Sequence, residues 1–475
     1  MSTPDNHPTA PTEVRMNRLS LNNLPTKPAV NPGELSVGIV HLGLGAFHRA
    51  HQAVFTERAA QLSGETRWGI AGISQRSAAV REQLAPQDGL YSVLTRGTDS
   101  TSIEVIGSIR EVLTAPEDPD AVVARIVDNR TSVITLTVTE KGYRAASGGG
   151  LDLSDPEIQA DLTGRPPRTV VGQLAAGLAR RTGEPLTILS CDNLVANGPF
   201  LQRLVHEYAD AAGLRGEQFE AAAFPASMVD RIVPATTDAD RDEAARLLGV
   251  RDEAVVVAEP FLQWVIEDHF AGARPAWETA GAVLTADVAP WEQAKLRMLN
   301  ATHSMLAYLG ALRGYETIAE AVRDDELAAT ARELISTDVI PTLTPPDGLD
   351  LASYGESVLE RFANPALKHK TTQVAMDGSV KLPVRLLGTI QDRLAANAEP
   401  ASAALAVAAW MVYVARSTTV DDPQADRLKS ATANAATPTA LVDALLAVDT
   451  VFPKDLQQSN PFRTLLVNHV THLTR

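Results

Sequence analysis

Three polar side chains, Lys295, Asn300 and His303, occur within nine residues of a segment whose apolar spacing predicts a helix. At about 100° per residue, His303 lies about 80° around the helix from Lys295, and Asn300 about 140°. All three can therefore reach one cleft. A buried lysine has a lowered pKa and can take a proton from an alcohol, while an amide can hold the developing alkoxide and an imidazole can orient a neighbouring hydroxyl. The polar face of an ordinary amphipathic helix is the alternative interpretation, and a more common one.

Two further segments place polar groups directly after predicted strands. Asn193 follows the strand at 186–189, and Val229 and Asp230 follow the strand at 224–228. Open α/β sheets bind ligands at the carboxyl ends of their strands. Asn193 is thus a candidate amide donor to the alkoxide, Asn193 and Val229 are candidate cofactor contacts, and Asp230 is a candidate ligand of a substrate hydroxyl. Loop and capping roles are the alternative for each.

A glycine turn follows the first predicted strand, which spans 36–42, and opens a predicted helix over 49–62. Gly43 and Gly45 match the first two glycines of a dinucleotide-binding fingerprint: one permits the tight turn, and the other lets the backbone approach a pyrophosphate. His48 stands where the third glycine belongs, so a plain strand–helix turn is the alternative. Gly43, Gly45, Ala46, Phe47 and His48 are the candidate cofactor contacts.

The segment after the second predicted strand, 68–73, contains no acidic residue that could bind the hydroxyls of an adenosine ribose. It contains Arg76, Ser77 and Arg81 instead. These side chains could accept a 2′-phosphate, or they could be solvated residues at the start of the helix predicted at 77–84. The choice between NAD and NADP therefore stays open.

Strands and helices alternate through the first part of the chain. Further strands are predicted at 89–95, 103–109, 132–138 and 186–190, and a helix at 170–181, which indicates a mostly parallel sheet with helices on both faces. From about residue 286, helical periodicity dominates, at 291–311, 316–323, 325–337, 355–362, 400–416 and 438–448. We therefore expect an α/β fold in which a tail (1–28, disordered over 1–15) precedes a Rossmann-like dinucleotide-binding domain (29–286) and a mostly α-helical substrate and catalytic domain (287–475).

The composition excludes several classes of protein. A formal net charge of −16 makes nucleic acid a poor partner. The lone cysteine, Cys191, excludes an internal disulfide framework and a multi-cysteine zinc site, and fits a reducing cytoplasm. The first 28 residues lack the apolar core of a signal peptide, and Met16 is a possible start. The most apolar stretch, 401–415, is too short to span a bilayer and predicts a helix buried between other helices. We expect a soluble cytoplasmic monomer.

Taken together, these segments resemble the long-chain polyol dehydrogenase family, which includes mannitol 2-dehydrogenases and fructuronate reductases. The resemblance extends from about Met16 to the C-terminal helices. Its blocks are HLGLGAFHRAH (41–51), SCDN (190–193), MVDRI (228–232), EPFLQWVIED (259–268), KLRMLNATH (295–303) and DGSVKLP (377–383). The lysine–asparagine–histidine spacing is the most specific of these signals.

The resemblance implies a role for each matching residue. Lys295 would be the general acid/base, with Asn193 and Asn300 around the reacting oxygen, and Glu292 would pass the proton of Lys295 towards solvent. The substrate would be oriented by His303, Asp230 and Lys381. The family implies a nicotinamide cofactor, NAD or NADP, and no metal. The acids that favour NAD in mannitol 2-dehydrogenases appear here as Ala78 and Ala79, so that preference is not carried over.

Basic residues in the C-terminal part bear on the substrate. Lys368 and Lys370 precede Lys381 and Arg385, and Gln373 stands where mannitol 2-dehydrogenases tend to have an arginine. A uronate carboxylate would be stabilised by a nearby lysine or arginine. The pattern favours the interconversion of fructuronate and mannonate, with Gln373, Lys381 and Arg385 as substrate contacts, over that of fructose and mannitol. The alternative is that Lys368 and Lys370 lie on a solvated surface.

Two other classes are weaker. A dinucleotide-binding sensor without catalysis would not need Lys295, Asn300 and His303 together. A zinc alcohol dehydrogenase would need several closely spaced cysteine or histidine ligands, whereas the histidine pair His48 and His51 belongs to the glycine turn.

Overall fold

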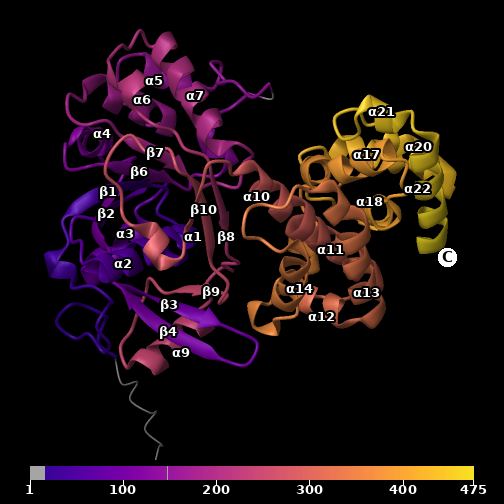
Figure 1. The fold of residues 1–475 in the computed structure, drawn as a ribbon, viewed down its shortest axis with the longest axis horizontal. Coiled ribbons are helices and arrows are strands. Elements are labelled where there is room, and N and C mark those ends of the chain that lie inside the picture. Colours follow the sequence, from indigo (N-terminus) through magenta and orange to yellow (C-terminus); the bar gives the residue numbers. More distant parts are fainter. Residues whose placement is uncertain (1–15, 147) are drawn as a thin grey trace, which may run out of the picture.

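The computed structural model describes residues 16–146 and 148–475, which form two lobes, an α/β lobe and a helical lobe (Figure 1). The predicted disordered segment 1–15 lies outside the described residues. The described part of the predicted tail packs on the α/β lobe: the Leu19 side chain is fully buried, and its backbone N–H donates to the carbonyl of Arg251 at 2.8 Å.

A five-stranded parallel sheet forms the centre of the α/β lobe. Its strands, in spatial order, are β5 (Ile109–Thr114), β2 (Gly69–Ser74), β1 (Val37–Leu42), β6 (Val133–Leu136) and β7 (Thr187–Ser190). Numbered along the chain within this sheet, the order is 3-2-1-4-5, the order of the Rossmann fold, and the direction of winding reverses between β1 and β6. The predicted fold class is confirmed.

Side chains that alternate along β1 build the two faces of this sheet. Val40 and Leu42 pack with α4 (Pro119–Val127), α6 (Val170–Arg180) and α7 (Asn197–Ala211). Ile39 packs on the opposite face, in a cluster with residues of α2 (Gln52–Ser63). This period of two is typical of a strand buried on both sides. The other helices of the lobe are α1 (Ala46–Ala50), α3 (Ala79–Leu84), α5 (Pro156–Leu162), α8 (Gln218–Ala221) and α9 (Asp238–Leu248).

Two smaller sheets complete the lobe. The predicted strand pair at 89–95 and 103–109 corresponds to β3 (Tyr91–Arg96) and β4 (Thr101–Ile106), which pair with each other and, through β3, with β9 (Val256–Ala258). The third sheet has the order β11 (Val283–Thr285), β10 (Gln263–Glu267), β8 (Ser227–Asp230). Figure 1 shows β8 and β10 on the side that faces the helical lobe.

Two predictions for the α/β lobe are wrong in detail. The helix predicted over 49–62 is two helices, α1 and α2, because the backbone leaves the helical region at His51 (φ −128°, ψ −89°). The strand predicted over 103–109 ends at Ile106, and the edge strand β5 follows it as a separate element.

The helical lobe begins after β11. Its longer helices are α11 (Ala301–Arg313), α13 (Asp325–Glu333), α14 (Leu351–Phe362), α18 (Ala401–Arg416), α20 (Pro438–Leu446) and α22 (Asn460–Leu473). The alanine-rich α18 is buried along most of its length, as the sequence predicts. No periodic pattern singled out α22, which covers α18. Among the described residues, no helix is both long and apolar enough to cross a membrane.

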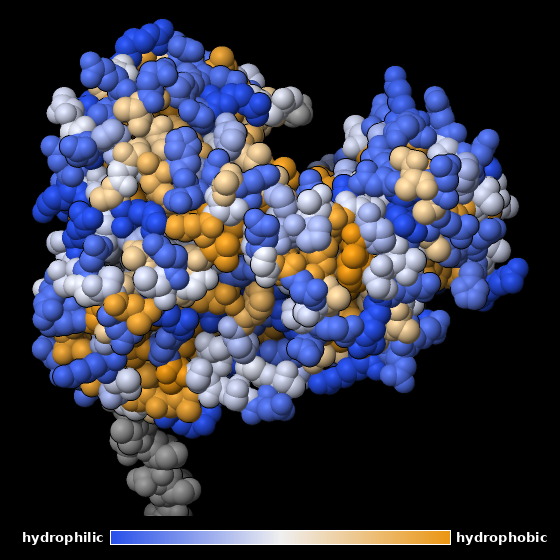
Figure 2. Space-filling model, viewed as in Figure 1, coloured by the Kyte–Doolittle hydropathy of each residue, from blue (hydrophilic) through white to orange (hydrophobic). Residues whose placement is uncertain are grey.

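Three π-helical turns interrupt the helical lobe: η5 (Lys295–Asn300), η6 (Leu334–Val339) and η9 (Pro383–Leu387). The shorter helices and 3₁₀ turns of the chain include α10 (Ala289–Ala294), α12 (Ile318–Arg323), α15 (Thr371–Val374), α16 (Gly378–Leu382), α17 (Gly388–Ala395), α19 (Ala425–Thr432), α21 (Lys454–Gln457), η1 (Pro32–Glu34), η2 (Ala85–Gln87), η3 (Glu140–Tyr143), η4 (Trp277–Ala280), η7 (Ile340–Thr342) and η8 (Pro365–Leu367). In the view of Figure 2, hydrophilic side chains cover most of both lobes, and a notch separates the lobes at the top.

Candidate active site

Two adjoining cavities lie where the carboxyl ends of β1, β7 and β8 meet the helical lobe. The first cavity has a volume of about 800 Å³ and extends from the glycine turn to α15. The second cavity, about 250 Å³, extends from β8 to α16 and η9. The residues that line both are Asp192, Asn193, Val229, Lys295 and Asn300.

The glycine turn forms one end of the first cavity. Gly43 has φ +99°, and a Cβ atom there would lie 2.2 Å from the carbonyl oxygen of Thr137. At Gly45 a Cβ atom would meet nothing closer than 3.7 Å, so no neighbour within the described chain requires a glycine at that position. Gly45, Ala46 and Phe47, three of the predicted cofactor contacts, line the cavity. A ligand that must approach the backbone closely accounts for the glycine at 45.

The His48 side chain does not line the first cavity. Its side chain is fully buried and stacks on the ring of His41, with ring centroids 3.4 Å apart. Burial lowers the pKa of His48 well below its ordinary value, so the ring is neutral. The predicted contact between the His48 side chain and a cofactor is therefore not supported: the side chain packs beneath the turn and not into the cavity.

The two glycines give a matched pair of substitutions. We expect Gly43→Ala to lower the free energy of unfolding by about 2–4 kcal/mol, because it forces a side chain into the left-handed region and against the Thr137 carbonyl. Gly45→Ala should cost less than about 1 kcal/mol but weaken dinucleotide binding. Urea denaturation and fluorescence titration measure the two effects. Equal loss of stability in both variants would contradict the distinction.

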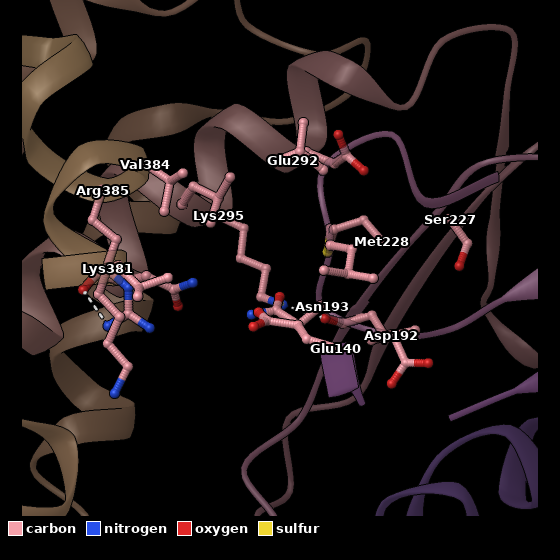
Figure 3. A pocket seen from close by; sticks show the side chains of 16 residues that line it. Glu140, Asp192, Asn193, Ser227, Met228, Glu292, Lys295, Lys381, Val384 and Arg385 are labelled. Atoms are coloured by element: carbon pink, nitrogen blue, oxygen red, sulfur yellow. Dashed lines mark hydrogen bonds between the residues drawn. The ribbon is translucent and has the colours of Figure 1, made fainter. Parts of the chain in front are cut away.

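Lys295 projects from the helical lobe to the ends of β7 and β8 (Figure 3). Its ammonium Nζ donates to Asn193 Oδ1 at 2.7 Å and to the carbonyl oxygen of Val229 at 2.6 Å. The side chain is buried, and burial lowers its pKa, with the cations of Arg361 and Arg385 adding to the effect and Asp230 opposing it. The two hydrogen bonds hold the ammonium in place. Because its pKa is lowered, Lys295 releases its proton more readily than an exposed lysine does.

Asn300 reaches the same cavities as Lys295 because the helix contains a π-helical turn. In η5 the backbone bonds connect residues five apart, so Asn300 returns to nearly the same side of the helix as Lys295. The separation of about 140° expected for a regular α-helix is therefore wrong. The Asn300 amide makes no hydrogen bond to another described residue, and it faces both cavities.

His303 lies deeper in the first cavity. Its ring stacks on Phe362 at 4.6 Å and meets the edge of His369 at 4.8 Å. Burial lowers the pKa of His303 well below its ordinary value, and Nε2 has no hydrogen-bond partner among the described residues. A neutral imidazole with an unused ring nitrogen can bind a hydroxyl group.

Glu292 lies one turn before Lys295 at the edge of the second cavity. The backbone N–H of Ala196 donates to both of its carboxylate oxygens at 3.3 Å. Burial raises the pKa of Glu292 to about 6. Glu292 and Lys295 form no ion pair, so a proton passing between them would need a bridging water.

Asp192, which the sequence did not single out, holds the loops around the site. Its carboxylate accepts from the N–H groups of Val138 at 2.9 Å and Thr139 at 2.8 Å, and from the hydroxyl of Tyr143 at 2.6 Å. These bonds join the loop after β6 to the loop after β7 and position the exposed Asn193. Its position in the segment 190–193 was the only available signal.

Asp230, the predicted ligand of a substrate hydroxyl, is already engaged by another side chain. Both of its oxygens accept from Arg361, at 2.8 and 2.9 Å. The same guanidinium donates to Glu259 at 2.7 and 3.0 Å, and all three side chains are buried. Burial alone would raise the pKa of Asp230, but Arg361 lowers it below its ordinary value. Because Arg361 belongs to α14 and both acids to the α/β lobe, this cluster joins the lobes beside the first cavity.

The basic residues of this region and Gln373 lie in three different places. Lys381 on α16 and Arg385 on η9 line the second cavity (Figure 3). Gln373 and Lys368 are exposed and line the first cavity. Lys370 lines neither cavity and forms a surface ion pair with Glu316 at 3.5 Å, so its predicted contribution to a substrate site is not supported.

No group of three or more histidine, cysteine, aspartate or glutamate side chains within residues 16–146 and 148–475 could hold a metal ion. Cys191 is buried, and burial raises the pKa of its thiol.

Comparison with known proteins identifies the class to which this fold and site belong. Residues 37–279 match the model of the mannitol dehydrogenase Rossmann domain, and residues 287–474 match that of the mannitol dehydrogenase C-terminal domain. The chain belongs to the mannitol dehydrogenase family of oxidoreductases.

Three known proteins are similar to this chain over nearly its whole length. It is 41% identical over 450 residues to the uncharacterized oxidoreductase YeiQ of Escherichia coli, covering 92% of each chain. It is 40% identical over 459 residues to the D-mannonate oxidoreductase of Escherichia coli, covering 93% of this chain and 94% of that one. The structure of Pseudomonas fluorescens mannitol 2-dehydrogenase in a ternary complex with NAD and D-mannitol superposes with a TM-score of 0.84 at 35% identity, covering 96% of this chain and 97% of that one.

Proposed function

We propose that the protein is a nicotinamide-dependent reductase that interconverts a keto-uronate and an aldonate, with fructuronate and mannonate as the substrate pair. The observation that carries the proposal is a pair of cations, Lys381 and Arg385, at the end of the second cavity that α16 and η9 form, away from the acids Glu140, Asp192 and Glu292 that line its other side (Figure 3). Arg385 lies there without a carboxylate partner among the described residues, donating to Ser304 Oγ at 3.0 Å and the Asn300 carbonyl at 3.4 Å. Within residues 16–146 and 148–475, the ammonium of Lys381 has one carboxylate neighbour, Asp377 at 3.9 Å, and it donates to the carbonyl oxygen of Met376 at 2.6 Å.

These two cations fit the carboxylate of a uronate. Burial lowers the pKa of Arg385 to about 10, which still leaves the guanidinium charged at neutral pH. An uncompensated buried cation is costly unless a ligand supplies the opposite charge. The cavity also contains Lys295 and Asn300, so a carboxylate bound there would keep the rest of the sugar acid at the candidate catalytic groups.

The residues around the first cavity fit a nicotinamide dinucleotide, because the backbone at Gly45 is open to close approach. Such a cofactor, when bound, supplies the hydride in the reduction and accepts it in the reverse direction. Lys295 gives its proton to the substrate oxygen as the carbonyl becomes an alcohol. The amides of Asn193 and Asn300 donate to that oxygen while it carries negative charge, and His303 orients a neighbouring hydroxyl. Glu292 exchanges the proton of Lys295 with solvent.

We also propose a domain boundary, a location and oligomeric state, and a role for Asp230. The chain divides at residues 286–287 into a dinucleotide-binding and a substrate-binding domain. The enzyme acts as a cytoplasmic monomer, and the cavities that contain Lys295, Asn193 and Asn300 need no residue of a second chain. Asp230 acts on the substrate from within its ion pair with Arg361, as one wall of the first cavity.

The proposal is tested by following the absorbance of the reduced nicotinamide with fructuronate and with fructose, each with NADH and NADPH. We expect oxidation with fructuronate. Arg385→Leu should lower kcat/KM for fructuronate by about 10- to 100-fold, because a charge-assisted contact is lost. Lys381→Met should act in the same direction, and the surface variant Lys370→Ala should match the wild type.

Oxidation with fructose alone would overturn the uronate assignment and make the protein a mannitol 2-dehydrogenase, like the relative whose ternary complex is known. Unchanged kcat/KM for fructuronate in Arg385→Leu and Lys381→Met would remove the second cavity as the carboxylate site.

A further inference from the structure

A third cavity, about 280 Å³, lies on the α/β lobe beyond the carboxyl ends of β2, β5 and β6. It shares the segment that follows β6 with the first cavity: Thr137 and Thr139 line the first cavity, while Val138 and Lys141 line the third. In a sheet of this strand order the pyrophosphate of a dinucleotide lies at the turn after the first strand, and the adenosine ribose lies past the second. The third cavity is therefore on the adenosine side of the cofactor site.

Four cationic side chains line this cavity: Arg76, Lys141, Arg144 and Arg168. Arg144 is neutralised by an ion pair with Asp155 at 3.1 Å. The side chains of the other three are exposed and form neither an ion pair nor a side-chain hydrogen bond with another described residue. Of the carboxylates in the described chain, Glu157 alone lines the cavity, so its net charge is positive.

The β2 side of the cavity has no acceptor for ribose hydroxyls of the usual kind. Gln75 and Arg76 follow β2 directly, and the amide of Gln75 is engaged with Gln173 at 3.2 Å. A carboxylate at this position would bind an unmodified ribose and repel a phosphate. In this protein the carboxylate is absent and cations line the third cavity. The cavity therefore lacks the usual acceptor for an unmodified ribose and attracts a phosphate.

We propose that the third cavity binds the 2′-phosphate of a phosphorylated nicotinamide dinucleotide through Arg76, Lys141 and Arg168, so that the enzyme prefers NADPH to NADH. This inference rests on the proposed function and specifies its cofactor. Guanidinium groups can bind a phosphate with two parallel hydrogen bonds, and a lysine adds a point charge. The three side chains are free to turn towards the phosphate without breaking an existing ion pair.

Arg81, which the sequence analysis grouped with Arg76 and Ser77, is not part of this site. It lies on α3, five residues after Arg76, and forms an ion pair with Glu117. It does not line the cavity. Arg81→Ala is therefore a matched control for Arg76→Ala, since it removes the same charge from a nearby position.

The test measures binding without catalysis. Isothermal titration calorimetry of the full chain with adenosine 2′,5′-bisphosphate and with 5′-AMP isolates the contribution of the 2′-phosphate. We expect the bisphosphate to bind at least about tenfold more tightly, as one charge-assisted contact to a phosphate predicts. The double variant Arg76→Ala/Lys141→Ala should lose most of that difference, and Arg81→Ala should keep it. Equal affinity of the wild type for the two nucleotides would overturn the inference.

The same experiments separate this inference from the proposed function. If fructuronate is reduced equally well with NADH and NADPH, the cofactor inference fails and the function stands. If the bisphosphate binds selectively but neither cofactor supports reduction of fructuronate, the cofactor inference stands and the substrate assignment fails.

Discussion

Replacing Lys295 with alanine is expected to lower turnover by about 10²- to 10⁴-fold, the contribution that a general acid or base usually makes. The structure gives the physical basis: the ammonium is buried, its pKa is lowered, and it is fixed between Asn193 and Val229 beside the Asn300 amide. Steady-state kinetics with fructuronate measures the loss. Cofactor affinity and thermal unfolding should change little, and Lys454→Ala, at an exposed position on α21, should match the wild type.

The pH dependence distinguishes proton transfer from mere packing by Lys295. Alcohol oxidation needs the neutral amine, so its rate should rise with pH and level off above the pKa of Lys295, at a value below the ordinary 10.5. Carbonyl reduction needs the ammonium, so its rate should fall through the same range. Near-normal turnover in Lys295→Ala, or an unchanged pH profile in that variant, would exclude Lys295 as the proton donor.

Removing Arg361 is expected to have the largest effect on stability. Arg361→Met leaves Asp230 and Glu259 buried without their counter-charge, which should lower the free energy of unfolding by about 3–5 kcal/mol. Urea denaturation measures the loss. The exposed ion pair between Arg332 and Glu356 is the control, and Arg332→Ala should cost less than about 1 kcal/mol.

The pH dependence of this loss has a definite sign. In the wild type, Arg361 lowers the pKa of Asp230, so that carboxylate stabilises the fold above its unfolded-state pKa and loses this contribution as pH falls. Without Arg361 the two buried acids have raised pKa values, so their protonation at lower pH removes the uncompensated negative charge that destabilises the fold. The difference in stability between wild type and Arg361→Met should therefore narrow as pH is lowered from about 8 to about 5. A difference that stays constant or widens would mean that uncompensated charge is not its cause.

Local patterns predicted much of the architecture. The apolar strands and the turn at Gly43 and Gly45 were sufficient to indicate the Rossmann-like domain, because strand period and glycine conformation are properties of neighbouring residues. The edge strand β5 was missed, since its sequence, IREVLT, mixes charged with apolar residues and directly follows another strand.

Features that depend on distant residues could not be predicted. Arg361 is 131 positions from Asp230, and nothing near either residue indicates the other. Arg385 on η9 and Lys370, directly before α15, looked alike in sequence, yet the first lines a cavity and the second is exposed, because only the packing of each segment against the rest of the chain decides which side faces inward. The candidate catalytic residues were identified by their spacing, but their geometry depends on a π-helical turn that no periodic pattern revealed.

That turn has a consequence for protein engineering. A π-helical turn holds one residue more than the α-helical turn that it replaces, so the helix behaves as if it carried a single-residue insertion between Lys295 and Asn300. Copying the segment 295–303 onto a straight helix of a designed scaffold would turn Asn300 away from the lysine by more than a quarter of a revolution. A transplanted site must therefore include the bulge and the packing that maintains it, and a scaffold chosen only for helix length and polarity would present the right residues in the wrong directions.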